Sequence, residues 1–252
     1  MEHITTLSLE IEPRESLGVS HANICSLGPM LQSVLMECAD DSYVEQLHAS
    51  TLNPYSQYCC ILDDDGIVWR MSALTDEAAS RLLEPAGKID SFTLRNINAS
   101  FSVVRKTCET VGVDRLLDIL KNCEESSFRV SFVAPASFRS KGQYVIVPDV
   151  RLMFQNLLMR YNQVYAGDSE IDAATVDYIA EHTRISSYAL RSRYFSRTMD
   201  KADKIPAFVG NITLHVSGPQ SLKGLVAMLL HFGEASGIGV KTSMGMGGIR
   251  LI

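Results

Sequence analysis

The spacing of apolar residues changes along this chain in an order that restricts the fold more than any other feature. In the first half, the patterns are typical of a strand, a helical region, two strands, a helix and a strand. These segments are residues 4–12, 21–38, 42–49, the two runs on either side of Asp63–Gly66, 75–84 and 99–107. This order predicts a ferredoxin-like fold of the α+β class.

Local signals indicate where several of these elements begin and end. The helix within 21–38 has one apolar stripe, formed by Leu27, Met30, Leu31, Val34 and Leu35. The acidic run Asp63–Gly66 ends in Asp-Gly, which is typical of a hairpin turn. Thr75 suits the N-cap of a helix that we expect to end before Pro85.

The second half can be read in the same way. Its segments are strands 128–138 and 140–148, helix 150–165, an acidic connector, strands 185–196 and 206–217, helix 221–236 and a short last strand. The sequence therefore predicts two tandem ferredoxin-like folds followed by a glycine-rich loop. We expect the boundary near 121–127, with an N-terminal domain over 1–124 and a C-terminal domain over 125–252.

The net charge of −6 argues against a protein that binds nucleic acid nonspecifically, but the charge is distributed unevenly. Residues 1–125 contain 9 basic and 20 acidic side chains, a net charge of −11, whereas 126–252 contain 14 and 9, a net charge of +5. The second half is therefore the better place to look for a polyanion partner. The acidic half can also simply favour solubility.

Neither a membrane span nor a metal site is expected. No apolar run approaches the roughly 20 residues that a spanning helix needs. The N-terminal residues lack the features of a secretory signal, so we expect a cytoplasmic location. The six cysteines form no CxxC pair and have apolar neighbours, which predicts buried, reduced thiols.

The most distinctive segment is the glycine-rich run near residue 240. Its glycines, including Gly237, Gly239, Gly245 and Gly247, allow close approach to the main chain, and exposed N–H groups in such a run can bind an anion. Lys241 adds positive charge, and Thr242 and Ser243 add hydroxyl groups. The run follows a helix, so it is not a P-loop. From composition alone, a flexible turn is an equal alternative.

Four segments resemble a known family. SGIGVKTSMGMGGI (236–249) resembles the C-terminal glycine-rich loop of the Cas-six endoribonucleases. Resemblance extends to PAFVGNITLHVSG (206–218), SFRSKGQYVIVPDVRLMFQNLLMRY (137–161) and VEQLHASTLNPYS (44–56), about half the chain in the family's order. The pattern is most similar to the type III-A (Csm) branch. The resemblance implies two ferredoxin-like folds and cleavage of CRISPR precursor RNA within its repeats, without metal or cofactor.

Such cleavage uses the neighbouring 2′-hydroxyl as nucleophile and leaves a 2′,3′-cyclic phosphate and a 5′-hydroxyl. It needs a base, an acid and a group that stabilises charge on phosphorus. Histidine suits proton transfer near neutral pH. His48 matches the family's Leu-His, which implies that it is the general acid/base, with His21 as the next candidate.

The second catalytic group is less well defined by the resemblance. Some family members have a tyrosine on the first helix and a lysine soon after the histidine, and this chain has neither. Lys141, which matches the family's hairpin, is the candidate that we adopt, and Tyr55 or a hydroxyl near Ser33 are alternatives.

Basic residues of the second half are the candidate RNA contacts. They are Arg139 beside Lys141, Arg151, Arg191 and Arg193, together with the glycine-rich run. Arg191 and Arg193 are two residues apart and therefore share a strand face. The aromatic residues Tyr188, Tyr194 and Phe195 interleave with the basic residues, a pattern that suits phosphate contact and base stacking. A solvated strand face is an equal alternative.

Two other functions compete with the nuclease. A non-catalytic RNA-binding subunit of a CRISPR effector complex would bind the repeat without cutting it. A small-molecule enzyme would use the glycine-rich run to hold a phosphate-bearing ligand, and mononucleotides would then stabilise it thermally. The expected partner is CRISPR repeat RNA, with a type III effector complex and a second copy of the chain as further candidates.

Overall fold

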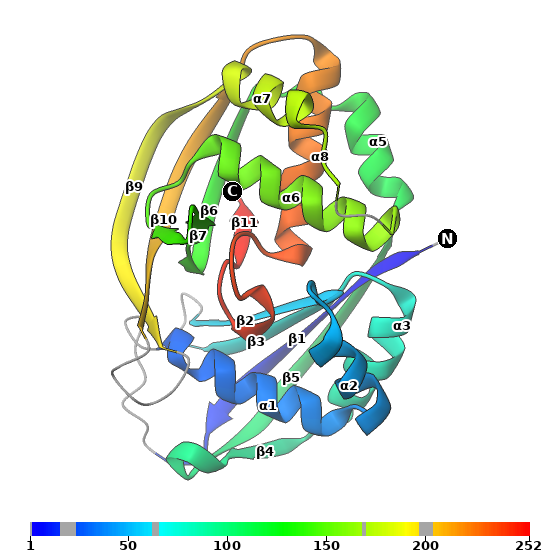
Figure 1. Ribbon diagram of the computed structural model, residues 1–252. Coiled ribbons are helices and arrows are strands. Elements are labelled where there is room, and N and C mark those ends of the chain that lie inside the picture. The colour runs from blue at the N-terminus through cyan, green and yellow to red at the C-terminus, as the bar shows by residue number, and fades with distance from the viewer. Residues whose placement is uncertain (1, 16–23, 62–65, 168–169, 197–203) are drawn as a thin grey trace.

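The computed structural model describes residues 2–15, 24–61, 66–167, 170–196 and 204–252. Two antiparallel sheets lie one above the other, and Figure 1 shows the red segment between α8 and β11 passing between them. His21 and the turn residues 62–65 lie outside the described residues. The strands that flank this turn pair antiparallel, as the sequence predicts.

The first half contains a five-stranded sheet with the order β2-β3-β1-β5-β4. Its strands are β1 (His3–Pro13), β2 (Tyr55–Ile61), β3 (Ile67–Ala73), β4 (Ser91–Leu94) and β5 (Ala99–Gly112). Helices α1 (Gly28–Cys38) and α2 (Asp41–Ala49) lie between β1 and β2. The central strand β1 pairs with β3 on one side and β5 on the other.

The second half contains a four-stranded sheet with the order β11-β6-β10-β9. Its strands are β6 (Ser127–Ala136), β9 (Thr183–Ser196), β10 (Lys204–Val216) and β11 (Ile249–Leu251). A hairpin of β7 (Phe138–Ser140) and β8 (Gln143–Val145) follows β6, and the main helices are α6 (Val150–Tyr165) and α8 (Gln220–Ser236). Both halves thus have the ferredoxin-like arrangement, which confirms the predicted fold class.

The helix after β3 differs from the prediction, because it continues through Pro85. It consists of α3 (Asp76–Ala78), a π turn over Ala79–Leu83 and α4 (Glu84–Ala86). The Thr75 hydroxyl caps it as expected, accepting a hydrogen bond from the Ala78 N–H over 3.2 Å. Pro85 lies in the first turn of α4, directly after the π turn, where the helical hydrogen-bond ladder is already interrupted.

Two helices are absent from the sequence prediction. α5 (Asp114–Asn122) connects the two sheets, and α7 (Ala173–His182) occupies part of the predicted acidic connector. Asp172 begins α7 by accepting hydrogen bonds from two backbone N–H groups of its first turn. The domain boundary after residue 124 would follow α5 directly, and it stays a prediction.

Each sheet buries one face under its own helices, and the predicted stripe on α1 is buried throughout. Leu74 is one exception to this separation, because it follows β3 but packs in the hydrophobic cluster of the second half, and Tyr58, Cys60 and Val68 form another with Ala134. The Tyr165 hydroxyl at the end of α6 donates to the Leu74 carbonyl oxygen over 3.0 Å. The two halves therefore share buried contacts.

Candidate active site and nucleic-acid interface

His48 lies in the last turn of α2, and its side chain is exposed. The helix begins at Asp40, whose carboxylate accepts a hydrogen bond from the Tyr43 N–H over 3.0 Å. Tyr43 and Leu47 are buried one turn apart and fix the rotation of α2 against the core. His48 therefore faces solvent from a helix whose orientation is set by its neighbours.

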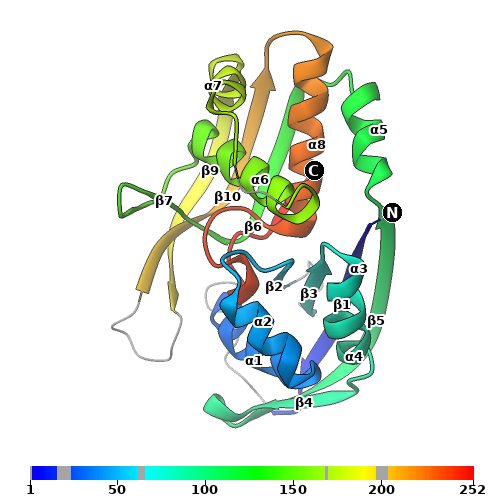
Figure 2. The same ribbon diagram turned by 45° about the vertical axis from the view of Figure 1, so that its right-hand side comes forward.

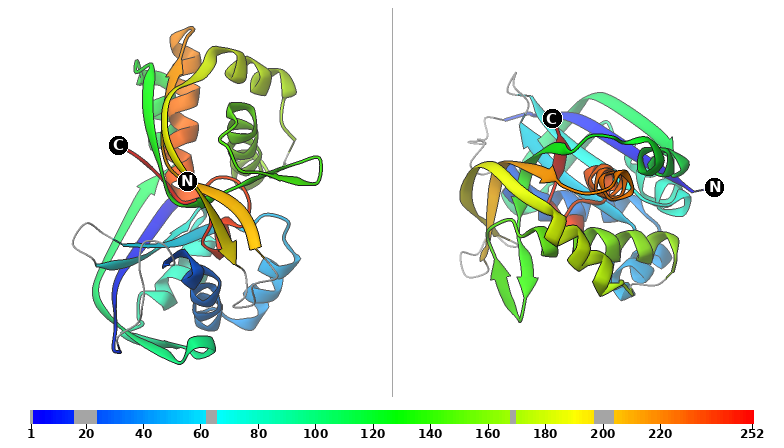
Figure 3. Two further views of the ribbon diagram at one scale, coloured as in Figure 1. Left: turned by 90° about the vertical axis from the view of Figure 1, so that its left-hand side faces the viewer. Right: turned by 90° about the horizontal axis from the view of Figure 1, so that it is seen from above.

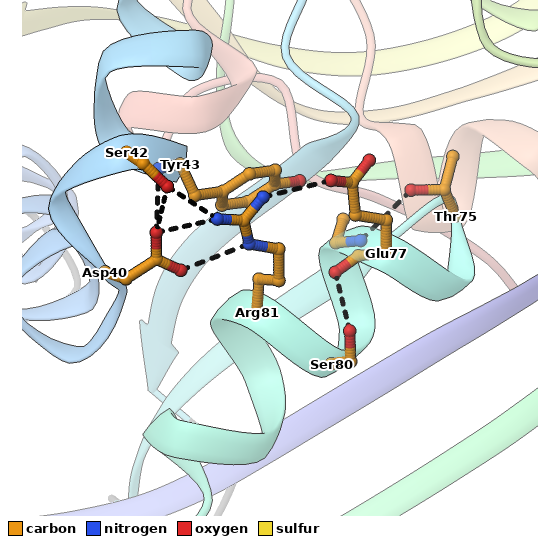
Figure 4. A network of polar contacts seen from close by, with 8 residues as sticks. Asp40, Ser42, Tyr43, Thr75, Glu77, Ser80 and Arg81 are labelled. Atoms are coloured by element: carbon orange, nitrogen blue, oxygen red, sulfur yellow. Dashed lines mark hydrogen bonds and ion pairs between the residues drawn. The ribbon is translucent and has the colours of Figure 1, made fainter.

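Arg81 fixes the first turn of α2 to the π turn after β3 (Figure 4). Its guanidinium donates to both carboxylate oxygens of Asp40, over 2.7 and 3.1 Å, and to the Ser42 hydroxyl over 2.9 Å. It also donates to Glu77 over 3.2 Å and lies 4.5 Å above the Tyr43 ring. These hydrogen bonds hold the pKa of Asp40 well below its usual range.

The chain between α2 and β2 contacts the glycine-rich loop, which we define as residues 237–248. The Asn53 amide nitrogen lies 3.3 Å from the Ser243 hydroxyl oxygen. On β2, the buried Gln57 amide donates to the carbonyl oxygens of Gly28 (2.8 Å) and Ser243 (3.1 Å), and it accepts from the Trp69 indole (2.8 Å). The segment that follows His48 is thus joined to the loop by hydrogen bonds.

The glycine-rich loop is mostly buried, which differs from the predicted exposed run of N–H groups. The N–H groups of Gly237, Gly239 and Gly247 donate to protein oxygens of α8, α6 and β6. Gly247 has a φ of +69°, and a Cβ there would lie 1.9 Å from the Ile238 carbonyl oxygen. The glycines therefore allow the loop to pack closely between the two halves.

Other loop residues predicted to bind RNA differ in exposure. Thr242 is buried with 3% of its surface exposed, and Ser243 is half-buried. Gly245 is buried against the backbone of Gly28. Lys241 is exposed and has a φ of +58°, so it is the predicted contact in this loop that presents a charge to solvent.

Lys141 lies at the tip of the β7–β8 hairpin, which projects from the body of the molecule (Figures 2 and 3). Lys141 and Gly142 both have positive φ, +49° and +79°, as a type I′ turn requires. Arg139 lies on β7 opposite Tyr144, and both side chains are exposed. No hydrogen bond or ion pair within the described part of the chain joins Lys141 to His48.

Arg151 begins α6 and is paired within the protein. Its guanidinium donates to the Asp177 carboxylate of α7 over 2.7 Å and to Gln155 over 3.0 Å. A phosphate would have to compete with the Asp177 carboxylate for this guanidinium. Arg151 is therefore a weaker RNA contact than the free cation that the sequence predicts.

Arg191 and Arg193 line a cleft of about 820 Å³ between the helix-free face of the second sheet and the first half. Lys204 and Arg250 line it as well, and the described residues around it include no carboxylate. Exposed Tyr194 borders the cleft, and the Lys204 ammonium lies 5.7 Å from the centroid of its ring. Positive charge and an exposed ring suit single-stranded nucleic acid.

The alternative proton-transfer groups are engaged in the structure. Tyr55 is 1% exposed, its hydroxyl accepts from Gln32 over 3.0 Å, and burial raises its pKa. The Ser33 hydroxyl donates to the Pro29 carbonyl oxygen within α1. Sequence reasoning missed Arg81 and Gln57. Gln57 is a lone amide within an apolar strand, and that isolation is a usable signal.

Among the described residues, no group of three or more metal-binding side chains lies together. No helix of the described chain is long and apolar enough to span a bilayer.

Comparison with known proteins gives consistent matches. A family model described as CRISPR-associated endoribonuclease Cas6 matches residues 130–249. A CRISPR-associated endoribonuclease Cas6 of Streptococcus thermophilus is 38% identical over 218 residues, covering 86% of this chain and 88% of the relative. The Cas6 of Mycobacterium tuberculosis H37Rv is 34% identical over 253 residues, covering 99% of this chain and 79% of the relative.

Solved structures agree with the fold. A Cas6 product complex superposes with a TM-score of 0.77 at 20% identity, covering 99% of both chains. A Thermus thermophilus Cas6 superposes with a TM-score of 0.71 at 17% identity, covering 100% of this chain and 99% of the other.

Proposed function

Because the chain belongs to the CRISPR-associated endoribonuclease Cas6 family, we propose that it cuts CRISPR precursor RNA within the repeats without a metal ion. The 2′-hydroxyl oxygen forms a bond to the adjacent phosphorus, and the bond from phosphorus to the 5′-oxygen breaks. A 2′,3′-cyclic phosphate and a 5′-hydroxyl result. CRISPR repeat RNA is the substrate, and the expected location is the cytoplasm.

The placement of His48 carries this proposal. Its side chain is exposed at the end of a helix fixed by Arg81, and the following segment is hydrogen-bonded to the glycine-rich loop through Asn53. A histidine held beside a substrate-binding loop can transfer the 2′-hydroxyl proton or protonate the leaving 5′-oxygen. Its position on a rigid element favours the alignment that the displacement needs.

Cations around this site supply the remaining interactions. Lys141, at the hairpin tip, is the proposed group that stabilises the charge developing on phosphorus once the RNA brings it to the site. Lys241 and Ser243 of the loop, together with Arg139, are proposed to contact the bound strand near the cut. Arg191 and Arg193 are proposed to bind its continuation in the cleft.

The decisive experiment measures cleavage of the cognate repeat RNA in excess EDTA by the wild type, His48→Ala and His231→Ala. We expect wild-type cutting that leaves a cyclic phosphate, and a loss of about a hundredfold or more in His48→Ala. His231 is an exposed histidine on α8 that contacts Glu234, so His231→Ala controls for the loss of a surface imidazole. Undiminished cutting by His48→Ala would reject this residue and retain the nuclease.

A non-catalytic RNA-binding subunit is the second candidate. The burial of Tyr55, which is 1% exposed, and the hydrogen bond that the Ser33 hydroxyl donates within α1 favour it, because they argue against either hydroxyl as a second proton-transfer group. Such a subunit would bind repeat RNA tightly and leave it intact under all metal conditions. A type III effector complex, or a second copy of this chain, would then be the partner to test by co-purification.

A further inference from the structure

Arg160, in the middle of α6, has a guanidinium that the protein does not compensate. Only 5% of the residue's surface is exposed, and Nε and Nη2 are buried without any hydrogen-bond partner. No carboxylate among the described residues pairs with it, and burial alone lowers its pKa to about 10. The side chain is therefore still charged at neutral pH.

The position of Arg160 follows from two contacts of α6. Asn156, one turn earlier on the same helix face, accepts a hydrogen bond from the Gly239 N–H over 2.7 Å. Tyr165, just over one turn later, donates to the Leu74 carbonyl oxygen of the first half. Arg160 therefore lies on α6 between the contact with the glycine-rich loop and the contact with Leu74, whose N–H donates to the Pro54 carbonyl oxygen of the segment after His48 over 2.9 Å.

A second unpartnered group belongs to this joint. The Asn53 carbonyl oxygen Oδ1 is buried without a donor, although the amide nitrogen of the same side chain reaches Ser243. The two groups do not satisfy each other in the structure, since neither has a partner. Buried polar groups are nearly always hydrogen-bonded, so two unpartnered groups in segments that are linked through Leu74 point to a missing partner for them.

A buried charge without a counter-ion weakens the fold, and its replacement by an apolar side chain usually does not. The buried charge of Arg160 is explained if the substrate supplies the counter-ion. Guanidinium is the side-chain group best matched to phosphate, because it donates two parallel hydrogen bonds. Nε and Nη2 are the buried atoms without a partner and Nη1 is outside that set, so a phosphate would meet the guanidinium through Nη1.

We propose that Arg160 binds a backbone phosphate of the RNA at the joint between the two halves and is a positioning residue for cleavage. This inference rests on the proposed function. The phosphate replaces the water that a charged group otherwise requires, and the strand is thereby held beside the glycine-rich loop and α2. RNA binding then supplies the electrostatic compensation that the free protein lacks.

The test compares the wild type with Arg160→Met and Arg160→Lys, with Arg95→Met as the control. Arg95 is an 83% exposed arginine of the first half that pairs with Glu37. Each protein is titrated with repeat RNA carrying a 2′-deoxy group at the cut site, at several salt concentrations, and its thermal midpoint is measured without RNA.

We expect Arg160→Met to bind about tenfold more weakly while its midpoint without RNA is unchanged or higher. The slope of log K against log salt should fall by about 0.7 to 0.9, the value for one lost phosphate contact. Arg160→Lys should keep most of the slope, because it keeps the charge, and Arg95→Met should bind as the wild type does.

A lower midpoint for Arg160→Met with unchanged affinity and slope would make Arg160 an internal structural group and overturn the inference. If Arg160→Met does not fold, wild-type affinity and cleavage by Arg160→Lys would still overturn the bidentate contact. Failure of the wild type to bind the repeat at all would instead remove the proposed function, and the inference with it.

Discussion

The side-chain nitrogen of Gln57 lies 3.1 Å from the carbonyl oxygen of Ser243, so a residue of the first sheet holds the glycine-rich loop of the second half. The same amide also bonds Gly28 and Trp69, and it is 1% exposed. One buried side chain thus satisfies three polar groups from α1, β3 and the loop. The geometry around His48 depends on this arrangement, although Gln57 itself does not reach solvent.

Gln57→Leu should destabilise the protein by about 2 to 5 kcal/mol, because three buried polar groups lose their partner at roughly 1 to 3 kcal/mol each, with partial relaxation. Repeat cleavage should fall as well, since the loop is released from β2. Denaturant unfolding and cleavage assays measure the two effects. Gln143→Leu, at an exposed hairpin position, is the control and should change neither.

Gly247→Ala should displace the loop, because the added Cβ would lie 1.9 Å from the Ile238 carbonyl oxygen and φ is +69°. Gly142→Ala is the matched control, since its φ is +79° but nothing lies within 4 Å of the added atom. The control isolates the backbone strain, about 1 to 2 kcal/mol. The Gly247 variant should lose clearly more, by denaturant unfolding. Equal losses would contradict close packing as the reason for this glycine.

Arg81→Met should lower the thermal midpoint and, by loosening α2, slow cleavage without affecting RNA affinity. Arg81 depresses the pKa of Asp40, so this stabilisation is fully present above the unfolded pKa of about 4 and is lost as the pH falls through the folded value. The midpoint difference between wild type and variant should therefore be constant from about pH 5 to 8 and shrink below about 4. A difference that changed around neutral pH would contradict the ion pair as its source.

Arg191→Ala and Arg193→Ala should each weaken RNA binding and reduce the salt dependence by about one phosphate contact, a slope of roughly 0.7 to 0.9. Cleavage of saturating RNA should be nearly unchanged, because the cleft positions the strand away from His48. Arg95→Ala is the control, since that side chain is 83% exposed and paired with Glu37 on the first half. An equal effect in the control would assign the change to net charge alone.

The periodic elements of the fold could be predicted from the sequence because the spacing of their apolar residues is enough to identify them. The stripe on α1 and the helix at 150–165 are of this kind. The helix through Pro85 could not, since the π turn that admits the proline depends on packing under the first sheet. α7 is short, and its start depends on the cap at Asp172 more than on hydrophobic periodicity.

The site was predicted less completely, because residue type does not reveal a partner. The sequence indicates His48 and the glycine-rich loop, but the loop's N–H groups at Gly237, Gly239 and Gly247 turn inward to protein oxygens. The sequence does not distinguish Arg151 from the other basic residues. Only the structure shows that Asp177 of α7 pairs with it. In the sequence, Arg160 fits the polar side of an amphipathic helix. Only the three-dimensional structure shows that its Nε and Nη2 atoms are buried.

The place of the glycine-rich loop in the chain also bears on biosynthesis. All five strands of the first sheet are encoded before residue 113, whereas the loop that joins the halves follows every strand except β11. During translation the first sheet can therefore form early, and α2 with it, while its contacts through Asn53 and Gln57 must await the synthesis of residues 237–248. A nascent chain would carry His48 on a finished helix without the loop beside it. The chain would then become able to cut RNA only after the ribosome has added the glycine-rich loop and the loop has packed between the two halves.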